Sequence, residues 1–321
     1  MRETVDVLVV GGGPAGLAGA LALGRARRSV LVVDAGQPRN APAAHAHNVL
    51  GQDGSSPREI LTRGRAEVGE VGVRVQDGRV VSATAQPGGG FAARLADGTE
   101  VHARRLLVAT GGVDQLPTVP GVRERWGRDV VHCPYCHGWE VRDQAVGVLA
   151  TSPLAVHQAL MWRQWTADVV LFVHEQQLPG ADELEQLAAR GIRLVEGVVA
   201  SLEVTDDALS GVRLVGGEVV PRAVVVAAGP VVAQDDVLVS LGLVTEDVLM
   251  AGQVLGRAVP ASDTGATAVP GVWVAGNVTA VNAQVVTSMA AGLWAGAQVN
   301  ADLIGEDTRL AVEAARAARA A

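Results

Sequence analysis

The chain has 321 residues, 49% of them hydrophobic, and a formal net charge of −8, which is enough apolar material for two domains of ordinary size. It contains no Lys, and its acidic balance with 3% aromatic residues argues against a nucleic-acid binder and against a protein of anionic membrane surfaces. No stretch reaches the length of an uncharged membrane span. The first apolar run begins too early for a signal peptide, so we expect a cytoplasmic protein.

The first predicted elements have the order of a dinucleotide-binding unit. Residues 5–10 predict a buried parallel strand, and residues 17–27 predict a helix rich in Ala and Leu. Residues 29–33 predict a second strand, which ends at Asp34. The turn between the first strand and the helix is Gly-Gly-Gly-Pro-Ala-Gly at residues 11–16. Because the glycine fingerprint stands in its full context, it predicts a dinucleotide site.

Each position of this fingerprint has a physical task. Gly11 permits the tight turn, Gly13 lets the backbone approach a pyrophosphate, and Gly16 lets helix and strand pack closely. The N–H groups at the start of the helix face the phosphates, and Asp34 is expected to hold the ribose hydroxyls. The predicted cofactor-binding residues of this segment are Gly11, Gly13, Pro14, Ala15, Gly16 and Asp34.

The stretch Cys133-Pro134-Tyr135-Cys136-His137-Gly138 holds both cysteines of the chain. A C-x-x-C pair can close into a small disulfide ring and open again by thiol–disulfide exchange. His137 follows the second sulfur directly and can move the proton that this exchange requires. Zinc is a weaker alternative because two cysteines supply only half of a usual ligand set. A pair of buried structural thiols is a second alternative.

Three further segments carry a family resemblance. One is the end of a predicted strand at Ala109-Thr110-Gly111, one is Ala275-Gly276-Asn277 after another strand, and one is the sequence Ala-Gln-Val-Val at residues 283–286. Together with the N-terminal glycines and the C-x-x-C, in this order and over nearly the whole length, they resemble the low-molecular-weight thioredoxin reductase family of flavoproteins.

The resemblance implies FAD as the cofactor. It adds Asn48, near the flavin, to the predicted contacts, and Asn277 stands where the family usually has Asp. The further cofactor-binding residues that it implies are Asn48, Ala109, Thr110, Gly111, Gly276, Asn277, Gln284 and Val285.

The resemblance also implies an α/β fold with two Rossmann-like domains, the second inserted in the first, in a three-layer sandwich. The FAD-binding domain would comprise residues 1–114 and 247–321. The insert, residues 115–246, would carry the C-x-x-C and resemble an NADPH-binding domain. The family is usually a homodimer, so we expect one here.

The second nucleotide site departs from the family pattern. Two of its glycine positions are Ala150 and Ser152, whose Cβ atoms would hinder a pyrophosphate, and Pro153 removes an N–H group. After the next predicted strand, Glu175 stands where basic residues would grip a 2′-phosphate. We therefore expect the insert to keep its fold and to have lost its nucleotide site. NADPH use, and NADH use through Glu175, are the alternatives.

Without NADPH the electrons would enter from a dithiol. The Cys-Pro-aromatic-Cys-His-Gly motif is similar to that of the dithiol oxidases of the gliotoxin and holomycin type, in place of the reductases' Cys-Ala-Thr-Cys-Asp. The resemblance implies that Cys133 exchanges with substrate, that Cys136 is the flavin-proximal sulfur, and that O₂ accepts the electrons as H₂O₂. His137 would be the base, because its reference pKa of about 6.5 suits proton transfer at neutral pH.

Three other functions stay open at this point. A thioredoxin-disulfide reductase linked to NADPH or ferredoxin is the main alternative, and a flavin redox sensor that does not turn over is a second. The dithiol could also belong to a protein rather than to a small molecule. We expect no metal, no nucleic acid and no membrane partner.

Overall fold

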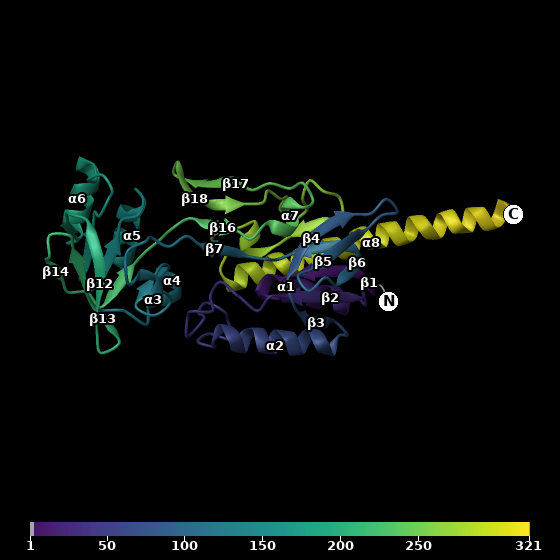
Figure 1. Cartoon of the computed structure of the whole chain (residues 1–321), viewed down its shortest axis with the longest axis horizontal. Coiled ribbons are helices and arrows are strands. Elements are labelled where there is room, and N and C mark those ends of the chain that lie inside the picture. Colours follow the sequence, from purple (N-terminus) through teal and green to yellow (C-terminus); the bar gives the residue numbers. More distant parts are fainter. Residues whose placement is uncertain (1–2, 321) are drawn as a thin grey trace.

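The computed structural model describes residues 3–320 and arranges them in two α/β units joined by crossing strands (Figure 1). The first unit is built on a sheet of order β3-β2-β1-β6-β5-β4, with β19 also paired to β6. Its strands are β1 (Glu3–Val10), β2 (Val30–Asp34), β3 (Arg74–Asp77), β4 (Val80–Ala85), β5 (Phe91–Leu95), β6 (Glu100–Val108) and β19 (Val272–Val274).

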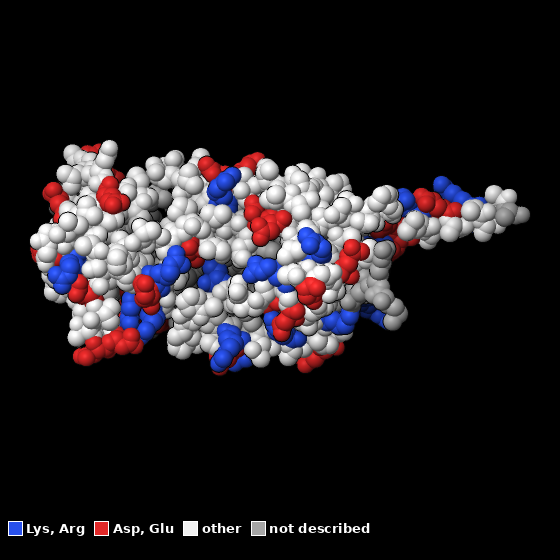
Figure 2. Space-filling model, viewed as in Figure 1, with Lys and Arg blue, Asp and Glu red and all other residues white. Residues whose placement is uncertain are grey.

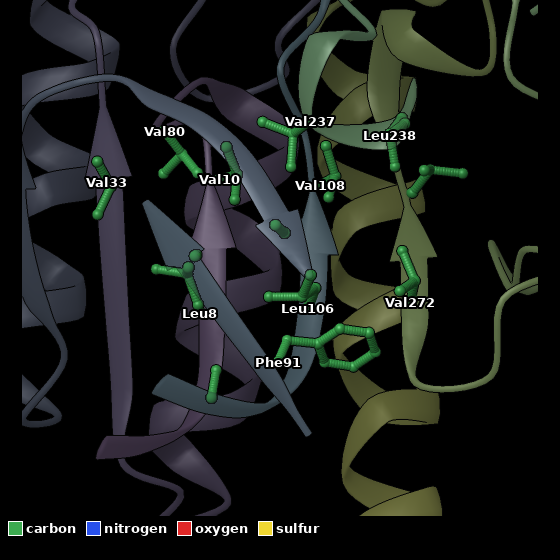
Figure 3. Close-up of a cluster of buried hydrophobic side chains, with 14 of the residues drawn as sticks. Leu8, Val10, Val33, Val80, Phe91, Leu106, Val108, Val237, Leu238 and Val272 are labelled. Carbon is green, nitrogen blue, oxygen red and sulfur yellow. The ribbon is translucent and has the colours of Figure 1, made fainter. Parts of the chain in front are cut away.

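Three helices cover one face of this sheet, and they are α1 (Pro14–Arg25), α2 (Pro57–Glu70) and α8 (Val285–Ala320). Val7 and Val9 point to these helices, whereas Leu8 and Val10 point to the opposite face, as the two-residue period of a strand requires. Figure 3 shows the cluster on that opposite face, where side chains from β1, β4, β5, β6 and β19 meet the short helix α7 (Asp236–Val239). Both faces of the parallel strands are therefore buried.

The second unit repeats this plan with different strands. A parallel sheet of order β11-β10-β9-β15-β8 has helices α5 and α6 on one face and an antiparallel layer of β12, β13 and β14 on the other. Its elements are α3 (Val122–Arg125), β8 (Val130–Val131), α4 (Pro134–His137), β9 (Val146–Leu149), α5 (Ala155–Trp162), β10 (Val169–Phe172), α6 (Ala181–Ala189), β11 (Arg193–Val195), β12 (Val199–Thr205), β13 (Ala208–Leu214), β14 (Val219–Val220) and β15 (Val224–Val226).

The chain crosses between the units through β7 (Gly112–Asp114) and β16 (Val231–Ala233), which pair with each other. A small sheet also contains β17 (Glu246–Met250) and β18 (Gln253–Ala258). Because β16 pairs with β7 and β18, the chain crosses back to the first unit at residues 231–233. The bounds of the insert, residues 115–246, stay a prediction. The α/β fold with Rossmann-type units is confirmed.

Helix α1 differs from its predicted bounds at both ends. It begins at Pro14 because Pro fits the first turn of a helix, where its missing N–H is not needed. It ends at Arg25, and the positive φ of 65° at Arg27 takes the backbone out of the helical conformation.

Helix α8 crosses the whole first unit and extends beyond it at the right of Figure 1. Small residues let it approach α1 closely, since a Cβ on Gly292 would overlap the Ala15 carbonyl oxygen and one on Gly296 would lie 2.7 Å from Gly19 O. None of its described side chains after Leu303 is buried. Within residues 3–320, no helix has the length and apolar character needed to cross a bilayer.

Candidate active site

The cysteine pair occupies a single tight turn at the end of β8. Cys133 precedes α4, and its carbonyl oxygen accepts the N–H groups of Cys136 (3.1 Å) and His137 (3.2 Å). A Cβ at Gly138 would lie 2.8 Å from the Trp165 ring, so glycine lets that indole pack against the turn. The motif is thus a rigid loop that holds both sulfurs side by side.

The two sulfurs have different acidities. A hydrogen bond from the Cys136 thiol, the largest cause, lowers the pKa of Cys133 to about 7, and the N–H groups of Cys136 and Tyr135 add to this against the effect of burial. The same hydrogen bond, with burial, raises the pKa of Cys136 well above its usual range. The reduced pair therefore carries its negative charge on Cys133 while Cys136 keeps its proton.

The ring of His137 makes no hydrogen bond within the described residues. Both of its ring nitrogens are buried. Burial lowers its pKa, against the opposing charge of Glu140, so the ring is neutral at pH 7 and free to accept a proton. The side chain of His132 is exposed at the surface. Desolvation by the surrounding protein atoms, the largest cause, and the charge of Arg39 lower the pKa of His132 as well.

Two predicted cofactor residues reach the cysteine loop from the first unit. Asn48, in the left-handed conformation at φ 61°, donates its side-chain amide to the Tyr135 carbonyl oxygen at 2.6 Å. The Gln284 amide donates to Cys133 Sγ at 3.8 Å. The site is therefore assembled from both units.

His47 makes a further bridge between the units. Its Nδ1 lies 3.2 Å from a carboxylate oxygen of Asp53, and its Nε2 lies 3.4 Å from one of Glu140, three residues after His137. Glu140 is distant from His47 in the chain, so only the fold could show this contact.

Arg39 is a functional candidate that the sequence did not reveal. It makes two hydrogen bonds to the Asp114 carboxylate, at 2.7 and 2.5 Å, and one to the Val281 carbonyl oxygen at 3.1 Å. Its charge acts to lower the pKa values of Cys136 and His132. No sequence motif connects Arg39 with Asp114, so only the fold could show this pair.

The glycine fingerprint forms the expected cradle at the end of β1. Gly11 has a φ of 102°, and a Cβ there would overlap the Ala109 carbonyl oxygen. A Cβ at Gly16 would overlap the Gly11 carbonyl oxygen, whereas the space beside Gly13 is open. Pro14 and Ala15 form the first turn of α1.

The acidic residue of this unit is more constrained than expected. Asp34 accepts the Gly12 N–H on one oxygen at 3.0 Å and Arg65 on the other at 2.5 Å. Arg65 also bonds Asp77 at 2.9 Å. Each carboxylate oxygen keeps a second acceptor position, so the predicted contact with ribose hydroxyls stays possible in geometry and stays a prediction.

The remaining predicted contacts lie at the ends of β6 and β19. Thr110 exchanges two hydrogen bonds with Gln234, at 2.6 and 2.9 Å. Gly111 has a φ of 77° and open space beside it. The Asn277 amide donates to the carbonyl oxygens of the following loop, at 2.9, 3.0 and 3.3 Å, which an Asp could not do.

Gly276, with a φ of 79°, lies where an added Cβ would be 3.0 Å from Ala15 Cβ. Val285 starts α8 and packs against a cluster of Ala46, Val49 and Ile60. These positions surround the start of α1, as a dinucleotide site requires.

The residues present fit a flavin dinucleotide. Open space lies beside Gly13 and Gly111 at the carboxyl ends of β1 and β6, and the buried His137 nitrogens lack a partner among residues 3–320. The fingerprint, Asn48 and the ends of β6 and β19 would hold such a group beside the cysteines. It would supply a two-electron acceptor.

The second unit also has a hollow at the carboxyl ends of its parallel strands. A cavity of about 420 Å³ lies there beside Ala150 and Ser152. None of the described residues that line it is Arg, Lys or His, and Glu175 and Glu183 are among them. The space of a nucleotide pocket is therefore present without a charge that could bind phosphate.

Comparison with known proteins agrees with this geometry. A family described as pyridine nucleotide-disulphide oxidoreductase matches residues 5–298. Thioredoxin reductase sirT of Leptosphaeria maculans is 30% identical over 320 residues, which cover 94% of this chain and 95% of the relative. Thioredoxin reductase tcpT of Claviceps purpurea is 39% identical over 168 residues, 51% of this chain and 52% of the relative.

The crystal structure of HlmI superposes with a TM-score of 0.89 at 44% identity, covering 98% of this chain and 96% of HlmI. The chain spans about half the length of the first curated relatives it matches. The family match over most of the chain and the full-length similarity to sirT show that it belongs to the pyridine nucleotide-disulphide oxidoreductase family.

Proposed function

We propose that this protein is an FAD-dependent dithiol oxidase that closes a disulfide in a small molecule and delivers the electrons to O₂. The observation that carries the proposal is the second cavity. It has the volume of a ligand pocket, but its described lining offers carboxylates and no cation for a phosphate. The cysteine loop beside the cradle is complete. Electrons would therefore enter through the thiols.

The surface beside the cysteines favours a small apolar substrate. Tyr135 and Trp139 lie next to the pair and are 62% and 66% exposed. Aromatic side chains of this kind provide contact area for an uncharged molecule. On the face drawn in Figure 2, positive and negative side chains are interspersed, so that face offers no basic area for an acidic electron carrier.

The chain's own residues carry out the exchange. A substrate thiolate attacks Cys133 Sγ of the oxidised pair, and Cys136 leaves as a thiolate that takes up a proton. The second substrate thiol gives its proton to His137, and its sulfur attacks the first substrate sulfur. A substrate disulfide forms, and Cys133 leaves as a thiolate.

The acidity of Cys133 supports its role as the leaving group of the last step. A thiol of lower pKa leaves faster in thiol–disulfide exchange, and Cys133 has the lowered pKa of about 7. The substrate has then lost two electrons and two protons, and the cysteine pair has gained two electrons. FAD, which the glycine fingerprint and the ends of β6 and β19 would hold, would supply a two-electron acceptor for the cysteines and a donor for the reduction of O₂ to H₂O₂.

Anaerobic flavin reduction tests the proposal. NADPH, NADH and dithiothreitol would be added separately to the purified holoprotein while the visible flavin absorbance is followed. We expect bleaching by dithiothreitol alone, with colour and H₂O₂ returning on air. Rapid bleaching by NADPH would instead establish a reductase.

Two variants examine the cysteine roles in the same assay. Cys136→Ser is expected to abolish bleaching by dithiol, because the sulfur proposed to pass electrons onward is gone. Cys133→Ser is expected to abolish it because no disulfide remains for the substrate thiolate to attack. Bleaching of Cys136→Ser at the wild-type rate would refute the scheme.

A further inference from the structure

One contact reaches a cysteine sulfur from the opposite unit. The Nε2 atom of Gln284 lies 3.8 Å from Cys133 Sγ. The backbone of Gln284 is fixed, because its carbonyl oxygen accepts the Ser288 N–H at 2.8 Å and the Thr287 hydroxyl at 3.0 Å. The backbone is thus held directly before the first residue of α8, and from there the amide reaches the sulfur.

In this contact Gln284 can only donate a hydrogen bond and Cys133 can only accept it. An amide nitrogen is only a donor, and a thiolate is a much better acceptor than a thiol. A donor that binds the charged form favours that form. Gln284 is accordingly one of the groups that lower the pKa of Cys133, after the Cys136 thiol and the neighbouring N–H groups.

We propose that Gln284 is a positioning residue that holds the negative charge of the reduced pair on Cys133, from across the boundary between the two units. The position of the charge does not depend on the proposed function. Only its consequence rests on that function, because a stabilised Cys133 thiolate leaves more readily when the product disulfide is released. Because the donor belongs to the first unit, the contribution of Gln284 is present only while the units are docked.

Other ionisable groups surround the pair and must be kept constant in any test. Cys136, His132 and His137 belong to the same segment as Cys133. The groups that act on this segment from other parts of the chain or from its end are Arg39, His47, Asp114 and Glu140. None of them is changed by a substitution at Gln284.

The test measures the thiolate directly in the holoprotein. The pair is reduced with a phosphine, treated briefly with iodoacetamide between pH 5 and 9, and the alkylation of Cys133 is quantified by peptide mass spectrometry. Gln284→Met keeps the size of the side chain and removes the donor. In this variant we expect the pH at which Cys133 alkylation is half-maximal (the Cys133 midpoint) to rise by about one unit. Alkylation at pH 5.5 should then be about tenfold slower than in the wild type.

Two companion variants exclude a structural explanation. Gln284→Asn keeps the donor on a shorter side chain and should fall between Met and wild type. Asn282→Leu, at an exposed position two residues earlier, should leave the midpoint unchanged, and flavin content is measured for each protein. An unchanged midpoint in Gln284→Met, or the same shift in Asn282→Leu, would overturn the proposal.

If Gln284→Met does not retain flavin, Gln284→Glu provides the same comparison with an acceptor in place of the donor. It should raise the Cys133 midpoint further, and an unchanged or lower midpoint would also overturn the proposal. Alkylation needs no dithiol turnover. The alkylation result therefore tests the role of Gln284 even if the bleaching assay refutes the oxidase proposal.

Discussion

His137 and His132 flank the cysteine pair, and the structure gives them different surroundings. The His137 nitrogens are buried and lack partners among residues 3–320, while the His132 side chain is exposed and lies near Arg39 and Asp114. A neutral, unpartnered imidazole is available to take a substrate proton. The arrangement favours His137 as the base.

We predict that His137→Ala slows dithiol-driven bleaching by about 100-fold, the usual contribution of a general base, and that His132→Ala slows it by less than tenfold. Burial lowers the pKa of His137. The wild-type rate should therefore be lost as the pH falls below the ordinary His value of about 6.5.

The ratio of wild-type to His137→Ala rates, measured by stopped flow from pH 5 to 8, isolates this group from the ionisation of the dithiol. It should rise with pH, because only neutral His137 accepts a proton. A constant ratio, or a larger loss in His132→Ala, would assign the base elsewhere.

Residue identities could be predicted from the sequence where the chemistry is local. The fingerprint glycines and the cysteine pair carry their function within a few positions. The contacts of Asp34 with Arg65, of Arg39 with Asp114 and of Gln284 with Cys133 join residues that are distant in the chain. No local pattern encodes these pairs. For Gln284 the sequence therefore predicted a contact with the cofactor and not the contact with Cys133.

Among the elements, the pairing of α1 with α8 determines how the cradle is held. Gly292 allows α8 to lie on the Ala15 carbonyl, and Ala15 belongs to the first turn of α1, which forms the cradle. The small residues of the last helix therefore support the cofactor site from behind.

We predict that Gly292→Ala lowers the unfolding free energy by about 1–3 kcal/mol, the cost of forcing extra volume into a packed contact, and weakens flavin retention. Gly305→Ala in the same helix is the matched control. A Cβ at Gly305 meets nothing within 4 Å, so helix propensity alone should stabilise by up to about 1 kcal/mol.

Urea unfolding of both variants as holoproteins, with released flavin measured in parallel, gives the change in unfolding free energy for each substitution. Equal effects of the two substitutions would show that the α1–α8 contact does not carry the cost. The first two strands and the helix between them were predicted from local apolar runs and a glycine turn, whereas the ends of that helix moved with Pro14 and Arg27.

The whole molecule places one redox loop between two Rossmann-type units that differ in their nucleotide sites. The first unit keeps its cradle of glycines, and the second keeps the cavity without cations in its described lining. The parallel sheet that builds each site is the same in plan. The difference therefore lies in a few side chains at strand ends, which the sequence identified at Ala150, Ser152 and Glu175.

We predict that restoring these features restores nucleotide binding. The triple variant Ala150→Gly, Ser152→Gly and Glu175→Arg removes two Cβ atoms from the turn and replaces a carboxylate by a guanidinium, the preferred partner of phosphate. NADPH affinity, measured by calorimetry on the holoprotein, should rise at least about tenfold over wild type, since one charge-assisted contact contributes about 1.5–3 kcal/mol.

Salt and cofactor choice serve as controls for this variant. Added salt should weaken the new NADPH binding, because it depends on exposed charges, and NADH, which lacks the 2′-phosphate, should gain less than NADPH. Wild-type protein that already binds NADPH as tightly as the variant would contradict the interpretation of the second cavity. In that case Glu175 would not exclude phosphate, and the thiols would not be the required entry point for electrons.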